Sequence, residues 1–431
     1  METIRLVNTI VTVLFSLCAA YQLFYMVVPF LTRRKPHLPE KQHRYAVLIA
    51  ARNEETVIGQ LIDSIRGQDY PAENITVCIV ADNCTDRTAE VARTHGALVY
   101  ERENHEQIGK GYALNFLLGR LKEDGRSDAF DGFLILDADN LLDPHYFTEI
   151  NRTFSDGYRI VTSYRNSKNF GDNWVSSGHG LLFLRESQFL NRPRMRLNTS
   201  CVVTGTGFLV SRSFLEEIGG WNFFLLSEDT QFTVQCLLRK EPVGYCEDAI
   251  FYDEQPTKFR QSWRQRMRWT KGYLQVFGRY TGKLVRGMFQ KRGFACYDLL
   301  MNNIPMILLP LIGVVLNLCV QIYGVLHGVD VWDSFWTMLL TGLEGYAMLL
   351  GMAAVTLFSE WKRIRATAFQ KWLSLFTFPL FMATYMPIAL AAFFCKAEWK
   401  PIVHTKAANI RDLEGPRSKK AKPDLTEAGN R

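Results

Sequence analysis

Four apolar segments limit what this chain can fold into more than any other feature. They lie at about residues 6–31, 299–326, 335–358 and 372–394. Each is long enough to cross a hydrocarbon core of roughly 30 Å as a helix. Three basic residues and no cleavage-type small-residue site follow the first segment, which therefore predicts a retained membrane helix and not a signal peptide. The 431 residues leave room for a soluble domain of about 250 residues with its own core.

The basic residues flank the apolar segments. The net charge is +7, and basic clusters at 33–35, 286–292, 362–365 and from Lys396 onward abut the membrane segments. This distribution is typical of the positive-inside rule. No base-reading motif accompanies it, so we expect no nucleic-acid partner. The nine cysteines form no Cys-x-x-Cys pair and fit reduced thiols that face the cytosol.

The charges and the number of spans disagree about the side of the C-terminal tail. One span before a cytosolic domain and three after it would place the tail outside. The basic residues from Lys396 to 422 favour the inside. The last apolar segment contains Pro379 and Pro387, which makes it a candidate for a broken or re-entrant element.

Between the membrane segments the sequence predicts an α/β domain. Apolar runs at 45–50, 75–80 and 133–136 are bounded by polar turns, as in strands buried on both faces of a parallel sheet. Segments 54–68 and 85–95 carry helical spacing, and residues 181–190 are a candidate interfacial helix. The expected divisions are an N-terminal membrane helix (1–35), a cytosolic nucleotide-binding domain (36–256), interfacial helices (257–295), a C-terminal membrane region (296–396) and a polar tail (397–431).

Two carboxylates follow the third predicted strand. Asp137 and Asp139 stand on alternate positions directly after the run 133–136, at the carboxyl end where open α/β sheets bind ligands. Two hard oxygen ligands there suit Mg²⁺ or Mn²⁺ that bridges a diphosphate. As an isolated tripeptide such a pair is more often a set of solvated loop charges, but its place after an apolar strand favours a site.

Polar residues also follow the first two predicted strands. Asp82 ends the second run, where it can accept hydrogen bonds from a base or ribose, and Glu54 follows the first run as a candidate for the same nucleotide site. The alternative for this region is helix capping, which we expect for Thr85 or Asp86 and for Asn53.

Three further motifs could serve a ligand or only the fold. Lys110, flanked by glycines at a predicted helix start, is a candidate pyrophosphate contact or a solvated turn lysine. Asp229 begins another predicted helix, where it is either a general base or a favourable charge behind an N-capping Ser227. A close backbone approach to a ligand, or a strand bulge, is expected at Gly205, Thr206 and Gly207.

The run Gln265-Arg266-Met267-Arg268-Trp269 lies in a basic amphipathic stretch. Its amide and second guanidinium are one helical turn apart and can donate to phosphates, and the indole offers a face on which a sugar can stack. Taken alone, a basic interfacial helix with an aromatic anchor would be the more common explanation. The carboxylate motifs upstream reverse those odds.

Taken together and in this order, these motifs resemble those of the membrane-embedded family-2 glycosyltransferases, which include cellulose, chitin, hyaluronan and poly-N-acetylglucosamine synthases. The resemblance covers about residues 45–273. It implies a GT-A fold with a Rossmann-like, mostly parallel sheet, beside an α-helical membrane region. It also implies a nucleotide-activated donor, usually a UDP-sugar, and Mg²⁺ or Mn²⁺ as cofactor.

The resemblance also implies a role for each candidate residue. Asp229 matches the catalytic base and Asp139 the metal ligand, whereas Arg266 and Met267 are variable positions without a role. The donor is expected to be bound by Glu54, Asp82, Lys110, Asp137, Gln265 and Arg268. The acceptor is expected to be bound by Gly205, Thr206, Gly207 and Trp269.

The function implied by the resemblance is an inverting transferase at the plasma membrane with its catalytic domain in the cytosol. Its leading form extends a β-linked polysaccharide of N-acetylglucosamine or glucose units and can couple extension to export. The alternative adds one sugar to a lipid acceptor. A third interpretation, a catalytically silent scaffold or transporter component, is disfavoured because every matched carboxylate is retained. No hydrolase triad or histidine cluster suggests another chemistry.

Overall fold

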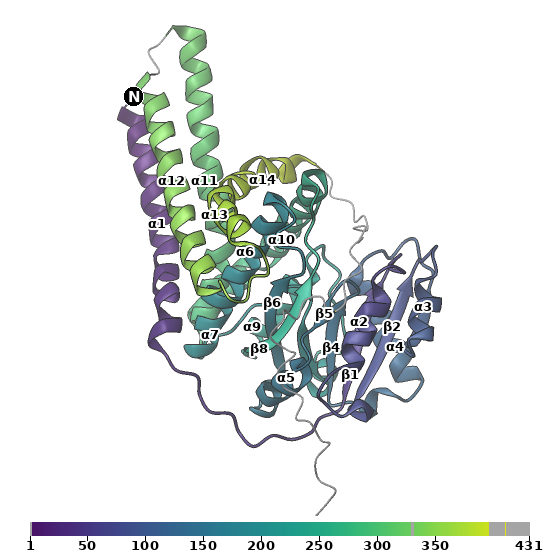
Figure 1. The fold of residues 1–431 in the computed structure, drawn as a ribbon. Helices are drawn as coiled ribbons and strands as arrows, with labels where there is room; N and C mark the ends of the chain where they lie inside the picture. The colour runs from purple at the N-terminus through teal and green to yellow at the C-terminus, as the bar shows by residue number, and fades with distance from the viewer. Residues whose placement is uncertain (1, 329–331, 396–409, 411–431) are drawn as a thin grey trace, which may run out of the picture.

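The computed structural model describes residues 2–328, 332–395 and 410. An α/β domain and a group of long helices that extend away from it make up this part of the chain (Figure 1). The predicted polar tail, 397–431, lies outside the described residues apart from residue 410.

One mixed sheet of eight strands forms the centre of the α/β domain. The strands are β1 (Tyr45–Ala51), β2 (Ile75–Asp82), β3 (Leu98–Arg102), β4 (Gly132–Asp137), β5 (Leu141–Leu142), β6 (Ile160–Ser167), β7 (Phe208–Ser211) and β8 (Val243–Asp253). Their order in the sheet is β3-β2-β1-β4-β7-β6-β8-β5. Strands β1 to β4 pair in parallel, as do β6 and β8, whereas β7 is antiparallel to both neighbours and β5 to β8. The predicted mostly parallel sheet is confirmed.

Helices cover both faces of this sheet. They are α2 (Ile58–Arg66), α3 (Thr88–Thr94), α4 (Lys110–Glu123), α5 (Tyr146–Ser155), α6 (Trp174–Glu186), α7 (Arg192–Arg196), α8 (Arg212–Glu217) and α9 (Glu228–Leu238), with a π-helical turn, η3 (Ser187–Asn191), between α6 and α7. Leu48 of β1 packs in the core that contains Leu117 of α4, and its neighbour Val47 packs in the core that contains Leu61 of α2. This burial on both faces explains the continuous apolar run of β1.

Helices α2 and α3 begin three to four residues later than the sequence pattern indicated. Asn53, in the left-handed region at φ 58°, accepts a hydrogen bond from the Thr85 backbone N–H (2.8 Å), so the two post-strand loops bind each other. Asp86 accepts from the Thr88 backbone N–H (3.0 Å), but the N-cap of α3 is Arg87, so neither Thr85 nor Asp86 takes the expected N-cap position. The polar residues after the strands therefore form paired turns before either helix starts.

Three long helices, α1 (Glu2–Leu31), α11 (Gly293–His327) and α12 (Trp332–Ser359), extend together from the domain (Figure 1). The described residues contain four stretches long and apolar enough to cross a membrane: Leu6–Leu31, Gly293–His327, Phe335–Ser359 and Ala368–Phe394. Helix α1 packs on α11, where Asn8 and Asn317 exchange side-chain hydrogen bonds of 3.0 and 2.9 Å. The four predicted apolar segments are confirmed as candidate spans.

The last of these stretches is broken. It consists of α13 (Ala368–Ala383) and α14 (Tyr385–Phe394), which meet at Thr384 and lie over α6 and α10 (Phe259–Met288) (Figure 1). Within its most apolar window 39% of the residues are buried inside the protein, compared with 6–11% in the other three stretches. The expectation of a broken element is confirmed, because two helices replace one continuous span, with α13 packed on α6 and α12 and α14 packed on α10 and α11.

Arg266 joins α10 to the broken helix pair. Its guanidinium is fully buried, donates to the Phe381 carbonyl (3.2 Å) and the Thr384 hydroxyl (2.7 Å), and lies 4.3 Å from the centre of the Phe381 ring. Arg266, the second residue of the pentad formed by residues 265–269, therefore has a structural function, consistent with the absence of a catalytic role.

A buried ion pair fastens the domain to α1 and α11. The Arg194 guanidinium of α7 binds both Asp298 carboxylate oxygens of α11 at 2.8 and 2.9 Å, and the Tyr25 hydroxyl of α1 donates to the same carboxylate (2.8 Å). Removing one partner of such a pair typically costs about 3–5 kcal/mol. The membrane helices are thus held in a fixed position relative to the sheet.

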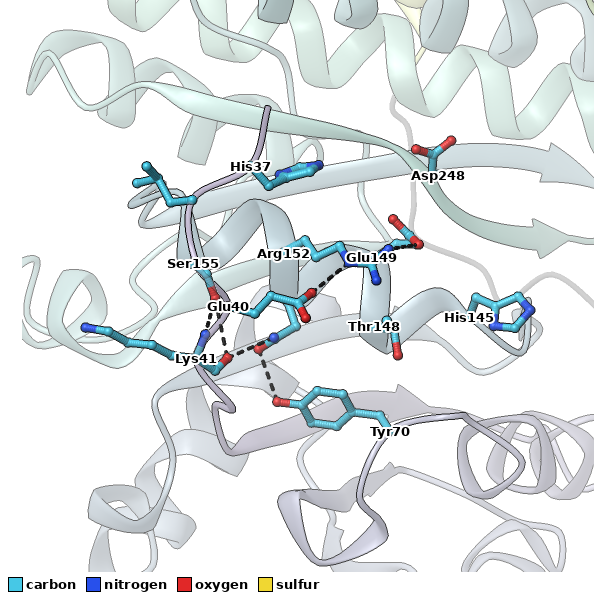
Figure 2. A network of polar contacts seen from close by, with 12 residues as sticks. His37, Glu40, Lys41, Tyr70, His145, Thr148, Glu149, Arg152, Ser155 and Asp248 are labelled. Carbon is cyan, nitrogen blue, oxygen red and sulfur yellow. Dashed lines mark hydrogen bonds and ion pairs between the residues drawn. The ribbon is translucent and has the colours of Figure 1, made fainter. Parts of the chain in front are cut away.

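The linker from α1 to β1 is also attached to the domain (Figure 2). Glu40 accepts from the Arg152 Nε of α5 (2.7 Å), and the Lys41 carbonyl accepts from the Asn151 side-chain amide (2.9 Å). The His43 backbone N–H donates to the Tyr70 hydroxyl (2.8 Å). These contacts, spread along the linker, define its path from the membrane helix to the first strand.

Candidate functional site

A cavity of about 1680 Å³ opens at the carboxyl ends of β1, β2 and β4 and continues between the long helices. A typical small-molecule pocket has about 300–1000 Å³, so this one has room for more than one ligand. The candidate residues line it, apart from Thr206 and Gly207. Those in its wall are Glu54, Asp82, Lys110, Asp137, Asp139, Gly205, Asp229, Gln265, Arg268 and Trp269.

The ends of β1 and β2 supply the first part of the wall. Asp82, the last residue of β2, is 4% exposed and forms an ion pair with Arg102 of β3. Glu54 follows β1, and its backbone N–H donates to the Thr88 hydroxyl (2.8 Å) at the start of α3. Both predicted nucleotide residues therefore lie at the same sheet edge, on loops fixed by hydrogen bonds.

The end of β4 brings a carboxylate, a lysine and a glycine together. The Lys110 ammonium, on the first residue of α4, forms an ion pair with Asp137 and donates to the Gly205 carbonyl (2.7 Å). Asp139 accepts from the Glu254 backbone N–H (3.0 Å) after β8. The parallel strands and the loop before β7 thus converge on one point.

These carboxylates fit a divalent cation that shares its ligands with a diphosphate. Among residues 2–328, 332–395 and 410, no cluster of three or more His, Cys, Asp and Glu side chains could hold a metal ion unaided. Mg²⁺ is usually held by one or two carboxylates and completes its shell with substrate phosphates and water. Asp137, whose side chain is 42% exposed, and Asp139 supply that number of carboxylates to the cavity.

Two acids at the start of α9 have raised pKa values. Burial, followed by the charge of Asp229, raises the pKa of Glu228 to about 7. Burial also raises the pKa of Asp229, while hydrogen bonds from the Thr230 backbone and hydroxyl oppose the shift. A raised pKa makes Asp229 a stronger base than an ordinary aspartate. Its neighbour Ser227 occupies the N-cap position of α9, but its side chain makes no capping hydrogen bond.

Ser227 instead provides a contact surface for α10. An added Cβ at Gly272 of α10 would lie 2.1 Å from the Ser227 hydroxyl oxygen, so only glycine allows this approach. The close packing brings the pentad of α10 over the start of α9.

Two side chains of the pentad carry buried polar atoms without a partner. Gln265 Oε1 and Arg268 Nε have no hydrogen bond among the described residues, although both side chains line the cavity. Loss of hydration lowers the pKa of Arg268, while the charges of Glu228, Asp137 and Asp229 oppose this shift. An unsatisfied buried polar group costs about 1–3 kcal/mol, which a ligand that hydrogen-bonds there would relieve.

Trp269 lines the cavity beside an aromatic group on α6. Its ring lies edge-on to His179 and Phe183, at centroid distances of 5.7 and 5.9 Å. Burial lowers the pKa of His179 and keeps the imidazole neutral. These contacts fix the orientation of the indole without occupying all of its surface.

The glycine loop before β7 contacts the site only through its first residue. Gly205 has φ +80°, and a Cβ there would lie 3.3 Å from Asp229 Oδ2. Thr206 is 1% exposed, and its hydroxyl accepts from the Asp137 backbone N–H (2.9 Å). A Cβ at Gly207 would lie 2.2 Å from the Phe251 ring. Thr206 and Gly207 therefore support the end of β4 and are not part of the cavity wall.

Several charged residues of the cavity were not predicted from the sequence, and three of them belong to β6 and α6. Arg165 of β6 binds Asp253 through its Nε (2.7 Å) and lies 3.5 Å from the centre of the Phe183 ring. Arg185 and Glu186, at the end of α6, also line the cavity. No sequence motif surrounds these residues. Only contacts between segments distant in sequence bring them to the site.

Comparisons with known proteins give a family, relatives and a fold. Residues 43–272 match the family described as glycosyltransferase like family 2. The beta-monoglucosyldiacylglycerol synthase of Synechocystis sp. is 27% identical over 58% of this chain and 51% of its own length. The poly-beta-1,6-N-acetyl-D-glucosamine synthase of Staphylococcus epidermidis is 22% identical over 53% and 54%. The chain thus spans about half the length of these curated relatives.

The fold is similar to that of a solved transferase. The mannosyltransferase PcManGT from Pyrobaculum calidifontis, in complex with GDP-Man and Mn²⁺, aligns with 90% of this chain and 99% of its own, with a TM-score of 0.57 and 17% identity. The GT-A architecture implied by the sequence motifs is confirmed.

Proposed function

This chain belongs to glycosyltransferase family 2, whose model covers more than half of it, and we propose that it transfers a sugar from a nucleotide donor to the hydroxyl of a membrane lipid. One observation carries the proposal. The cavity that contains the donor-site carboxylates continues between the long helices, where much of its wall is apolar, as at Ala19 and Leu23 of α1, Met306 and Pro310 of α11, and Leu349 of α12.

The apolar wall favours lipid chains over a polysaccharide. Sugar hydroxyls buried without hydrogen-bond partners cost free energy, whereas acyl chains gain by leaving water. The glucosyldiacylglycerol synthase among the relatives supports this choice of acceptor.

Extension of a β-linked polysaccharide is the second candidate. Trp269 favours it, because the indole lies in the cavity wall and can support a sugar by stacking. The poly-N-acetylglucosamine synthase among the relatives agrees with it. The two candidates share a donor and differ in acceptor and product length.

In the proposed reaction Asp229 takes the proton of the acceptor hydroxyl. The freed oxygen attacks the anomeric carbon from the face opposite the nucleotide, and the bond from that carbon to the diphosphate breaks, which inverts the configuration. The leaving diphosphate takes up its negative charge beside Arg268 and Lys110. A divalent cation held by Asp139 and Asp137 would neutralise part of that charge.

Sizing the product distinguishes the two candidates. The purified protein, in vesicles of phospholipid and diacylglycerol, would receive radiolabelled UDP-sugars or GDP-mannose with Mg²⁺ or Mn²⁺. We expect label from one donor in an organic-soluble species of lipid size. Label in a water-soluble product of high molecular weight would contradict a lipid acceptor and support polymer extension. Omission of the metal, or addition of a chelator, should abolish incorporation and so tests the dependence on a divalent cation.

The broken helix pair predicts the side of the membrane that Cys395 faces. Three crossings, by α1, α11 and α12, leave the catalytic domain and the end of α14 on the same side, as the positive charges from Lys396 onward require. The test variant retains only the exposed Cys395, and the control carries Asp128→Cys in a cysteine-free background. In vesicles of known orientation, a membrane-impermeant maleimide should label both variants from the same side. Labelling of the two from opposite sides would show four crossings.

A further inference from the structure

The arginines near the end of α6 differ in their partners. Arg165 pairs with Asp253, Arg194 with Asp298, and Arg192 and Arg196 with Glu247. Arg185 forms no ion pair with any carboxylate of the described residues. Its side chain donates to the neutral Gln22 amide of α1 and lines the cavity. Among the described residues, this arginine therefore has no ion-pair partner, and the charge of the adjacent Glu186 acts on it from farther away.

The surroundings of Arg185 suit an anionic group. Gln22 continues a row of amides by donating to Asn302 of α11 (3.3 Å), and Asn302 and Asn303 line the same cavity. Burial raises the pKa of the adjacent Glu186, and the charges of Arg194 and Arg165 oppose that shift. Burial lowers the pKa of Arg185, the charge of Glu186 opposes this shift, and a bound anion would oppose it further. The side chain of Arg185 is half-buried in the cavity wall, so an anion bound there would stabilise its charge.

The position along the helices matches the headgroup side of a bilayer. Gln22 precedes the domain-side end of α1, Leu31, by nine residues, and Asn302 follows the domain-side start of α11, Gly293, by nine residues. At 1.5 Å per residue both lie about 13 Å from those helix ends. Farther from the domain, much of the cavity wall on α1 and α12 is apolar, with Phe15 and Met348 as examples, although Glu344 of α12 also lines it. Arg185 and the amides thus lie nearer the domain than most of this apolar surface.

We propose that Arg185 binds the phosphate of an anionic phospholipid, whose acyl chains lie in the cavity between α1 and α12 and whose headgroup hydroxyl is the acceptor. This assignment rests on the proposed function and narrows its substrate class. Arg185 and Asp229 line the same cavity, so a headgroup held at Arg185 shares that space with the base. Charge-assisted, bidentate hydrogen bonds are the strongest that a guanidinium makes with phosphate.

The binding test compares lipids that share their chains. Detergent-purified protein would be titrated with dioleoylphosphatidylglycerol and with dioleoylglycerol, and bound lipid counted by native mass spectrometry. We expect wild type to prefer the phospholipid by about tenfold or more, the value of one charged hydrogen bond. Arg185→Gln should remove this preference. Arg279→Gln, an exposed arginine of α10, should retain it and so controls for surface attraction.

A second variant separates loss of lipid binding from misfolding. Gln22→Glu leaves Arg185 in place but gives it a carboxylate partner, so the preference for phosphatidylglycerol should disappear while thermal stability is kept. Equal binding of the two lipids to wild type, or persistence of the preference in Arg185→Gln or Gln22→Glu, would overturn the assignment. Displacement of the phospholipid by equimolar inorganic phosphate would identify free phosphate as the ligand and also overturn it. The proposed function is tested separately by sugar transfer to dioleoylglycerol in the same preparations. Such transfer would support a lipid acceptor even if the phosphate assignment of Arg185 were wrong.

Discussion

Replacing Asp229 with asparagine should lower sugar transfer by about 10²- to 10⁴-fold, the usual value of a positioned general base. Asparagine keeps an oxygen that can accept the hydrogen bond from the Thr230 backbone N–H (2.7 Å), so the start of α9 should remain intact. It cannot accept the proton of the acceptor hydroxyl. Initial rates of radiolabel transfer at saturating donor would measure the loss.

The matched control is Asp128→Asn. Its carboxylate is 84% exposed and pairs with Arg212 at the surface, so transfer should stay near the wild-type rate. Affinity for the nucleoside diphosphate, measured by calorimetry, should change little in Asp229→Asn, because the base acts on the acceptor. Transfer within threefold of wild type in Asp229→Asn would exclude this residue as the base.

Removing the guanidinium of Arg268 should have the second largest effect. Arg268→Gln is expected to lower the transfer rate by about 10²- to 10³-fold, the value of one preorganised donor to a developing negative charge. The affinity for nucleoside diphosphate should fall as well, because the unpartnered Arg268 Nε and the charge of the side chain are lost together. The measurements are single-turnover transfer and calorimetric titration with the nucleoside diphosphate.

Arg264→Gln, one turn earlier on α10, provides the comparison. Its side chain is exposed and absent from the cavity wall, so the same change there should leave both measurements unaltered. A normal affinity for nucleoside diphosphate in Arg268→Gln would contradict the assignment of this residue to the leaving group.

The sequence predicted the cavity residues that follow the parallel strands better than those of the glycine loop before β7. Asp82 and Asp137 follow strands that belong to one parallel sheet, and the ends of neighbouring parallel strands meet by geometry. Strand β7 was not predicted, because its antiparallel place between β4 and β6 is set by long-range pairing. Thr206 was assigned to the acceptor side for the same reason, since its burial against the β4 end depends on that strand. Arg185 and Arg165 had no local signal at all.

The role of Ser227 shows a second limit of local patterns. A serine before acidic residues at a helix start predicts an N-cap, and Ser227 does precede α9. The structure uses its small size instead, because Gly272 of α10 approaches it closely. Only the packing of two helices distant in sequence shows this use.

Arg266 joins α10 to the helix pair α13 and α14 through its bonds to Phe381 and Thr384. On α10 it stands between Gln265 and Arg268, which line the cavity. If α13 and α14 rest on the bilayer, a change in bilayer thickness would displace them at a cost of fractions of a kcal/mol per Å. The bonds of Arg266 would then carry this displacement to the helix that holds Gln265 and Arg268. The rate of transfer should therefore vary with acyl-chain length even where the donor concentration is fixed.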